Sequence, residues 1–163
     1  MSTVLIADDD ADHRELLTLA LRRAGHDVVA AEDADGAMTA LRTGSFDAAL
    51  LDVRMPGESG IELCARLRAE PATALLPVMM LSADVNDQKI VAALHAGADD
   101  YMTKPFHRAE LCARLDNLML HKPSPARQSA TAAAAAAAAA RAGSRALREA
   151  AVLTPEPRGA RTA

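Results

Sequence analysis

Four short, mostly apolar runs in the sequence each end beside residues whose side chains can take part in chemistry. These residues are three aspartates, a serine and a lysine: Asp8 and Asp9 after residues 4–7, Asp52 after 48–51, Ser82 after 78–81, and Lys104 after 100–103. If the four runs are parallel strands of one sheet, these side chains meet along its carboxyl edge, where open α/β sheets hold their ligands. The sequence therefore predicts a pocket that contains three carboxylates, a hydroxyl and an ammonium group.

This set of groups is suited to phosphoryl transfer. Three close carboxylates repel one another unless they share protons or bind a cation, and an oxygen site with room for water suits Mg²⁺. The cation and Lys104 would neutralise a phosphoryl group, whose transfer requires mainly positioning and charge stabilisation. The Asp52 carboxylate can act as the nucleophile and form an aspartyl-phosphate, and the Ser82 hydroxyl can donate a hydrogen bond to the new group. We therefore expect a magnesium-dependent phosphoryl-transfer site.

Strand-like and helix-like segments alternate along residues 3–121, which places the four runs in one sheet. Expected strands cover residues 4–7, 27–31, 47–52, 77–81 and 99–103. Apolar residues at helical spacing predict helices at about 11–24, at about 35–43, around Ile61, Cys64 and Leu67, around Ile90, Val91 and Leu94, and around Leu111, Leu115, Leu118 and Met119. Five repeats of strand and helix predict a doubly wound parallel sheet of the α/β class.

The composition of the 163-residue chain limits the classes of function. Aromatic residues make up only 2% of it, which leaves little for stacking bases or flavin rings. The formal net charge is −4, but residues 123–163 hold six arginines and only two glutamates, so the charge of −8 on the rest of the chain makes its body acidic. An acidic body does not favour nucleic-acid binding, and the basic tail is too sparse to indicate it. Cys64 and Cys112 lack the spacing of metal ligands. We therefore expect both cysteines to be buried as small apolar side chains and the protein to occupy a reducing compartment.

The sequence carries no targeting or membrane signal that we recognise. The N-terminus lacks the basic and apolar regions of a signal peptide, and no apolar run approaches the ~20 residues of a membrane span. We expect a cytoplasmic protein with no membrane partner. After Lys122 the composition changes to Ala, Arg and Pro, with nine consecutive alanines at 132–140. We therefore expect one domain over residues 1–122 and a mostly disordered Ala/Arg/Pro-rich tail over 123–163.

Four strings in this order resemble the receiver domain of bacterial two-component response regulators. They are VLIADDD at 4–10, LDVRMPG at 51–57, LSA at 81–83 and GADDYMTKPF at 97–106. The resemblance covers about residues 2–121 and implies a flavodoxin-like fold, with a five-stranded parallel sheet in the order 2-1-3-4-5 and five helices. It further implies a phosphorelay switch whose donor is a sensor histidine kinase or a phosphotransfer protein, with no enzyme activity beyond its own phosphorylation and dephosphorylation.

The resemblance also implies roles for individual residues. Asp52 accepts the phosphoryl group, Lys104 pairs with that group, Ser82 is drawn toward it, and Tyr101 swings inward as the switch. At the metal site Asp9 binds Mg²⁺ directly, Asp8 helps to hold it largely through water, and Asp52 and the backbone carbonyl of Arg54 complete the protein ligands. By the same resemblance the bond from Lys104 to Pro105 is a cis peptide, which is rare enough to mark a specific need.

Two further residues are expected at the mouth of the pocket. Arg54 lies two residues after the acceptor Asp52, and Asp84 lies two residues after Ser82. Their opposite charges can pair across the phosphoryl group and hinder an attacking water. We therefore predict a long-lived phosphoryl state.

The output surface is expected on the fourth helix, the fifth strand and the fifth helix of the sequence pattern. Its candidate exposed residues are Lys89, His95, Tyr101, Glu110 and Arg114. The partner is a protein that the sequence does not identify, or a second phosphorylated copy of the chain. Glu110 and Arg114 resemble the dimer face of receivers attached to winged-helix domains, although the fourth helix lacks the basic residue that such a face uses.

Simpler and competing interpretations remain open. Helix capping explains Asp10, but it does not explain four strand ends at once. The five histidines are expected on the solvated surface, and Asp99 and Asp100 are expected to begin a strand at the surface. A phosphatase of the haloacid-dehalogenase type would use Asp52 as nucleophile but needs a second aspartate where Arg54 stands. A flavodoxin-like flavin binder would need a phosphate loop and aromatic residues that the chain lacks.

Overall fold

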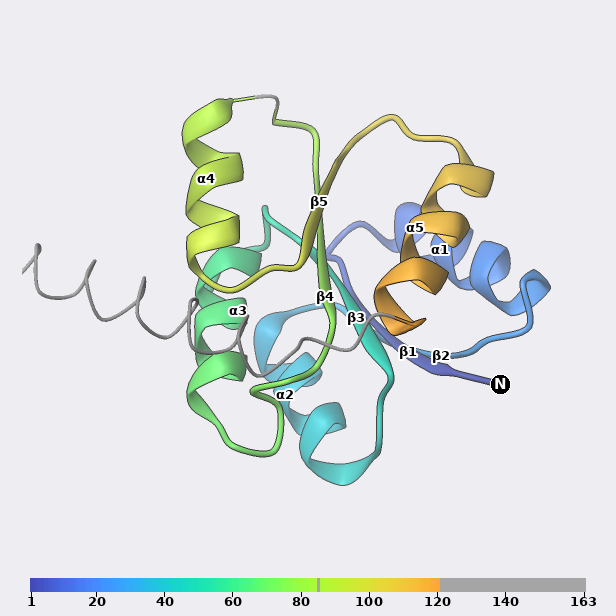
Figure 1. Cartoon of the computed structure of the whole chain (residues 1–163), viewed down its shortest axis with the longest axis horizontal. Helices are drawn as coiled ribbons and strands as arrows, with labels where there is room; N and C mark the ends of the chain where they lie inside the picture. The colour runs from blue at the N-terminus through green and yellow to red at the C-terminus, as the bar shows by residue number, and fades with distance from the viewer. Residues whose placement is uncertain (85, 121–163) are drawn as a thin grey trace, which may run out of the picture.

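A computed structural model describes residues 1–84 and 86–120 of the chain. Strands and helices alternate over these residues (Figure 1), with the bounds β1 Thr3–Ala7, α1 Ala11–Arg23, β2 Asp27–Ala31, α2 Ala34–Thr43, β3 Ala48–Asp52, α3 Gly60–Ala69, β4 Val78–Ser82, α4 Asp87–His95, β5 Asp100–Thr103 and α5 Arg108–Leu120. The tail expected at 123–163 lies outside the described residues. Of the helices described, none is long and apolar enough to cross a bilayer.

The strands form one parallel sheet in the order β2-β1-β3-β4-β5. Every residue of β3 and β4 is buried, as expected when helices cover both faces of a parallel sheet. Helices α1 and α5 lie on one face, and α2, α3 and α4 lie on the other (Figure 1). The predicted α/β class, strand order and flavodoxin-like topology are therefore confirmed. All five strands point their carboxyl ends to the same edge.

Polar caps fix where most of the helices begin. The side chains of Asp10, Asp33, Ser59 and Asn86 each accept a hydrogen bond from a backbone amide in the first turn of the helix that follows. Such caps satisfy amides that have no partner inside the helix. The cap at Asp10 sets the start of α1 directly after the two aspartates that follow β1, so the helix and the pocket share one short connection.

Helical spacing predicts the positions of α1 and α4 well but not their buried faces. Leu17 and Leu21 of α1 are buried, whereas Leu16 is 65% exposed. In α4 the buried residue is Ala93, while Val91 and Leu94 are 50% and 45% exposed. The small alanine lets α4 pack closely on the sheet edge, so the larger side chains on either side of it are left facing solvent.

Candidate functional site

The acidic residues predicted to meet do so at the carboxyl edge of the sheet. Asp8 follows β1 directly, and Asp52 is the last residue of β3. Carboxylate oxygens of Asp8, Asp9 and Asp52 all lie within 4.8 Å of one another. Asp8 and Asp52 are only 1% and 7% exposed, while Asp9 faces solvent. Two of the three charges are thus held away from water.

Lys104 places the positive charge of the pocket on Asp52. Its Nζ lies 2.8 Å from Oδ2 of Asp52 and 3.6 Å from Oδ2 of Asp8. The backbone amide of Lys104 donates to the carbonyl of Ser82 at 2.8 Å, which continues the pairing of β5 with β4 beyond the last strand residue. The bond from Lys104 to Pro105 is cis, as the resemblance implied.

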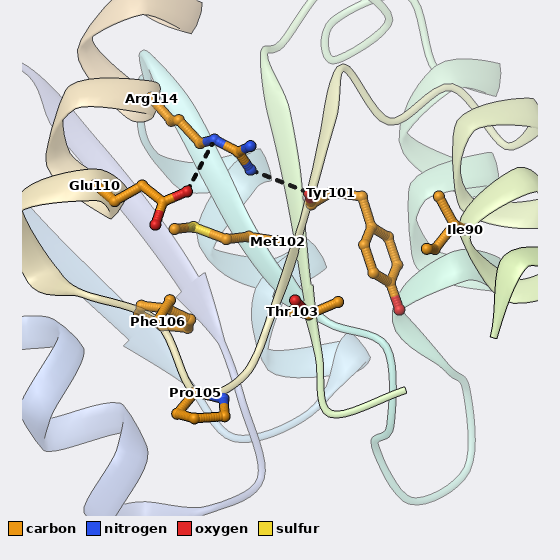
Figure 2. Close-up of a pocket in the computed structure, with 8 residues that line it drawn as sticks. All are labelled: Ile90, Tyr101, Met102, Thr103, Pro105, Phe106, Glu110 and Arg114. Carbon is orange, nitrogen blue, oxygen red and sulfur yellow. Dashed lines mark hydrogen bonds and ion pairs between the residues drawn. The ribbon is translucent and has the colours of Figure 1, made fainter. Parts of the chain in front are cut away.

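Ser82 is fully buried at the end of β4, where its Oγ accepts a hydrogen bond from the amide of Asp84 at 3.1 Å. Its hydroxyl proton is therefore available to another acceptor. The Tyr101 hydroxyl donates to the carbonyl of Asp84 at 3.0 Å. Figure 2 shows the Tyr101 ring between β5 and Ile90 of α4. Ser82 and Tyr101 are thus both connected to the short segment after β4.

Arg54 and Asp84 form an ion pair beside the acceptor. The Nε and Nη2 atoms of Arg54 lie 3.2 and 2.9 Å from Oδ2 of Asp84. Lys89 of α4 lies 3.4 Å from the same oxygen. The hydrogen bond from Arg54, with help from Lys89, holds the pKa of Asp84 below its usual value. The backbone amide of Arg54 donates to Oδ1 of Asp52 at 3.0 Å, which ties this pair to the acceptor.

The two buried carboxylates have pKa values shifted in opposite directions. Burial raises the pKa of Asp52, and the negative charge of Asp8 adds to this effect; hydrogen bonds from Lys104 and from the amide of Arg54 offset it only in part. Burial also raises the pKa of Asp8, but hydrogen bonds from His13 and the Asp10 amide, together with the charge of Lys104, outweigh burial and hold it below its usual value. Ionisation of Asp52 is therefore less favourable here than in water, and added positive charge would favour it.

The donor set fits a bound Mg²⁺. Three carboxylates converge on one point, and a single lysine compensates for part of their charge. Hard oxygen ligands with an open, solvated side match the preference of Mg²⁺, which keeps several of its waters. Asp9 provides that open side because it is exposed. The predicted fourth ligand, the carbonyl oxygen of Arg54, stays a prediction.

Sequence reasoning missed residues that support this pocket from behind. The imidazole Nδ1 of His13 is hydrogen-bonded to Oδ2 of Asp8, and Arg14 donates to the backbone carbonyl of Asp8 at 2.8 Å. The expectation that all five histidines are solvated is wrong for His13 and also for His26, whose side chain is 9% exposed and lies 3.2 Å from Asp116. The signal for His13 was its place in the first turn of α1, directly after the aspartates.

Gly60 was also missed, and its reason is steric. A Cβ atom at this position would lie 2.1 Å from the backbone oxygen of Asp52. The amide of Gly60 donates to the carbonyl of Val53 at 3.1 Å. The first turn of α3 therefore packs directly against the backbone of Asp52, and only glycine fits there.

The expected output surface contains a pocket of about 250 Å³ between α4, β5 and α5 (Figure 2). Its lining comes from one residue of α4, from β5 and the loop after it, and from α5: Ile90, Tyr101, Met102, Thr103, Pro105, Phe106, Glu110 and Arg114. Arg114 lies 3.7 Å from Glu110 and 3.8 Å from Asp100. Three of the predicted surface residues thus line one pocket next to the loop that carries Lys104.

Comparison with known proteins matches residues 4–116 to the response regulator receiver domain. The chain is 40% identical over 128 residues to the phosphate regulon transcriptional regulatory protein PhoB of Pseudomonas aeruginosa, covering 78% of this chain and 56% of PhoB. It is 46% identical over 112 residues to the transcriptional regulatory protein CseB of Streptomyces avermitilis, covering 69% of this chain and 46% of CseB. The chain thus spans about half the length of these curated relatives.

Solved structures give the same result. The receiver domain of the Francisella response regulator 1452 superposes with a TM-score of 0.69 and 32% identity, covering 74% of this chain and 98% of that one. The receiver domain of the sensor histidine kinase PA1611 of P. aeruginosa has a TM-score of 0.69, 28% identity and the same coverage of both chains. That structure contains a magnesium ion coordinated in its active site cleft.

Proposed function

Because the chain belongs to the family of response regulator receiver domains, we propose that it accepts a phosphoryl group on Asp52 in a two-component phosphorelay. The donor is the phosphohistidine of a sensor histidine kinase or a phosphotransfer protein. The observation that carries this proposal is the meeting of Asp8, Asp9 and Asp52 within 4.8 Å, with Lys104 on the acceptor. We propose residues 1–122 as the receiver domain.

The proposed reaction is an in-line displacement at phosphorus. A carboxylate oxygen of Asp52 attacks the phosphoryl group, an O–P bond forms, and the N–P bond of the donor breaks; the released imidazole keeps the electron pair and takes a proton from solvent. Mg²⁺, held by Asp8, Asp9, Asp52 and the carbonyl of Arg54, would supply positive charge beside the transferring group. Lys104 stabilises the same negative charge from the side of β5, and Ser82 donates its free hydroxyl proton to a phosphoryl oxygen.

The new phosphoryl group is proposed to act as a switch. Ser82 moves toward it, and Tyr101 turns inward to occupy the space that is left. Since the Tyr101 hydroxyl is bonded to the carbonyl of Asp84, a shift of the segment after β4 breaks or moves this bond. The altered surface of α4, β5 and α5 then binds a downstream protein or a second copy of the chain through Glu110 and Arg114.

We further propose that the ion pair of Arg54 with Asp84 prolongs the phosphorylated state. The pair lies at the mouth of the pocket, and the backbone amide of Arg54 is bonded to the acceptor carboxylate. A guanidinium held there occupies the approach of a hydrolytic water. Hydrolysis of the aspartyl-phosphate is the only other reaction that we assign to the protein, which we place in the cytoplasm.

The proposal is tested by incubation with acetyl phosphate and Mg²⁺ followed by intact mass measurement. We expect one added phosphoryl group, lost in Asp52→Asn and kept in the control variant Asp27→Asn, whose aspartate begins β2 and is exposed. Absence of the adduct in the unmodified chain would contradict the proposal. Rapid multiple turnover with free phosphate release would instead favour a phosphatase, for which Arg54 occupies the position of the needed general acid.

A further inference from the structure

We propose that His13 is a positioning residue, which holds the carboxylate of Asp8 toward the metal site and away from Lys104. The inference rests on the proposed function, because it concerns the same magnesium site. It concerns a residue of α1 that touches neither the acceptor nor the phosphoryl group.

The carboxylate of Asp8 is held by donors on both of its oxygens. Oδ1 accepts from the backbone amide of Asp10 at 3.0 Å. Oδ2 is bonded to Nδ1 of His13 and lies 3.6 Å from Nζ of Lys104. An ionised carboxylate has no proton to give, so Nδ1 of His13 is the donor in this bond. The side chain of Asp8 is 1% exposed, so water does not replace a partner that is lost.

Packing fixes the orientation of the imidazole that makes this bond. The His13 ring lies edge-on to the ring of Phe106, with centroids 6.0 Å apart and planes at 71°. Its side chain is 22% exposed. Phe106 follows Lys104 and Pro105 in the loop after β5. One side chain of α1 therefore contacts the metal-side aspartate and also the loop that carries the lysine.

The shared oxygen gives His13 a specific role. Lys104 has two carboxylates within reach, Asp52 at 2.8 Å and Asp8 at 3.6 Å. If the donor on Oδ2 of Asp8 is removed, Lys104, 3.6 Å away, is the cation toward which this buried oxygen can turn. That turn takes Asp8 out of the metal position and draws Lys104 from the acceptor. Hydrogen bonds that orient a ligand in this way typically change metal affinity by about 10–100-fold.

Two substitutions separate the hydrogen bond from the packing. His13→Asn keeps a nitrogen donor at the same number of bonds from the backbone as Nδ1 but removes the ring. His13→Phe keeps a ring against Phe106 but removes the donor. Histidine, asparagine and phenylalanine have similar helix propensities, so the cost to α1 is nearly the same in both variants.

The test measures Mg²⁺ affinity by isothermal titration calorimetry of the full chain, together with urea unfolding of the metal-free protein. We expect His13→Phe to weaken Mg²⁺ binding about 10-fold or more, with metal-free unfolding close to that of the unmodified chain. We expect His13→Asn to bind within about threefold of the unmodified chain, a difference below 1 kcal/mol.

The outcomes distinguish this inference from the proposed function. Weaker Mg²⁺ binding in His13→Phe than in His13→Asn supports the inference, since a role of His13 in packing alone would make His13→Asn the weaker binder. Equal Mg²⁺ affinity in all three proteins would overturn the role of His13 while leaving the metal site intact. If the unmodified chain binds no Mg²⁺, or if Asp9→Asn binds it equally well, the magnesium site of the proposed function fails and the inference fails with it.

Discussion

Two clusters of charge lie at opposite ends of the same sheet, and they differ in how their charges are balanced. Near the amino ends of β4 and β5, Nη2 of Arg68 lies 3.0 Å from Oδ2 of Asp99. The other guanidinium N–H groups donate to backbone carbonyls, including those of Gly97 and Ala74. Oδ2 of Asp99 also accepts a hydrogen bond from the backbone amide of Val78 at 2.8 Å. This cluster, the Arg68 cluster, has one charge of each sign and satisfied donors.

The pocket at the carboxyl ends is buried to a similar degree but is not balanced. Asp8, Asp9 and Asp52 converge on one lysine. Lys104 is bonded to Asp52, yet burial and the charge of Asp8 outweigh it and keep the pKa of Asp52 above its usual value. Buried charge alone therefore does not indicate a functional site. Charge that lacks its counterpart does, because a cation or a ligand is needed to complete it.

The largest effect on stability is expected in the Arg68 cluster. Arg68→Met keeps most of the side-chain volume but leaves Asp99, 14% exposed, without its cation. Breaking such a buried pair costs about 3–5 kcal/mol of unfolding free energy. Urea unfolding measures it. The matched control is Arg42→Met, whose pair with Glu70 is 59% and 37% exposed and should cost less than about 1 kcal/mol. Equal losses of unfolding free energy in the two variants would mean that the Arg68 cluster does not stabilise the fold more than an exposed ion pair does.

Each cluster also contains a glycine that lies close to neighbouring atoms. Substituting alanine for these two glycines should have different consequences. A Cβ at Gly60 would meet the backbone of Asp52, whereas one at Gly97 would meet the Arg68 side chain at 2.7 Å, with φ at +105°. Gly60→Ala should cost about 2–3 kcal/mol by overpacking and abolish phosphorylation, because the acceptor backbone must move.

Gly97→Ala is the counterpart in the Arg68 cluster. It should cost about 1–2 kcal/mol, the price of a left-handed conformation for a residue with a Cβ. Its phosphorylation by acetyl phosphate should continue at the normal rate. Urea unfolding and the mass assay measure both quantities in each variant. Loss of phosphorylation in folded Gly97→Ala would show that the two ends of the sheet are not independent.

The imbalance of the pocket predicts that removing the acceptor charge stabilises the metal-free protein. Asp52→Asn should raise the unfolding free energy at pH 7 by about 1 kcal/mol, a usual size for a single substitution. The folded-state pKa of Asp52 lies above the unfolded value of 3.8, so ionised Asp52 opposes folding. The protonated form of Asp52 contributes to folded-state stability below pH 3.8, and this contribution is lost as pH rises through the folded-state pKa. As pH rises through that pKa, Asp52→Asn should therefore lose less unfolding free energy than the unmodified chain does.

Asp8 should change stability in the opposite direction. Its folded-state pKa lies below 3.8, so its contribution is present above pH 3.8 and is lost as pH falls through the folded-state value. Urea unfolding of the metal-free protein at several pH values separates the two aspartates. A pH profile for Asp52→Asn that matches the unmodified chain would contradict the charge imbalance.

The sequence predicted the fold and the acidic pocket because both follow from local patterns. Alternating apolar runs and helical spacing define the elements, and parallel strands bring their carboxyl ends together without any further information. Predicted strand limits differ from the observed ones by one residue or less, as for 77–81 against Val78–Ser82. Helix caps such as Asp10 are likewise readable from neighbouring residues.

The missed residues depend on contacts that become visible only once the elements are placed in space, although the position of His13 directly after the aspartates was a local signal. Asp99 was expected at the surface, and this is wrong, since it is 14% exposed and paired with Arg68, 31 residues earlier in the chain. His13 was expected in solvent, but its partner Asp8 turns back toward α1. Gly60 reads as an ordinary helix start until the backbone of Asp52 is placed beside it. Only Asp99 has a partner far away in sequence; His13 and Gly60 contact Asp8 and Asp52, five and eight residues earlier, through the geometry of the connections between strand and helix.

The smallest expected effect on stability, but a measurable kinetic one, belongs to the rim pair of Arg54 and Asp84. Arg54 is 70% exposed, so Arg54→Ala should change the unfolding free energy by less than about 0.5 kcal/mol. The same change should speed hydrolysis of the phosphorylated protein about three- to tenfold, which corresponds to roughly 0.6–1.4 kcal/mol in the barrier. Decay of the adduct, followed by intact mass after removal of acetyl phosphate, measures this rate.

A second variant shows whether Arg54 acts through its partner. Asp84→Asn removes the charge that holds the guanidinium at the rim, where Lys89 also competes for Oδ2 of Asp84. If the ion pair is what excludes water, each single variant speeds hydrolysis and the double variant adds little, because coupled residues are not additive. Arg42→Ala, far from the pocket in an exposed pair, should leave the rate unchanged. Unaltered hydrolysis in Arg54→Ala would show that this exposed pair only completes the surface, as most exposed ion pairs do.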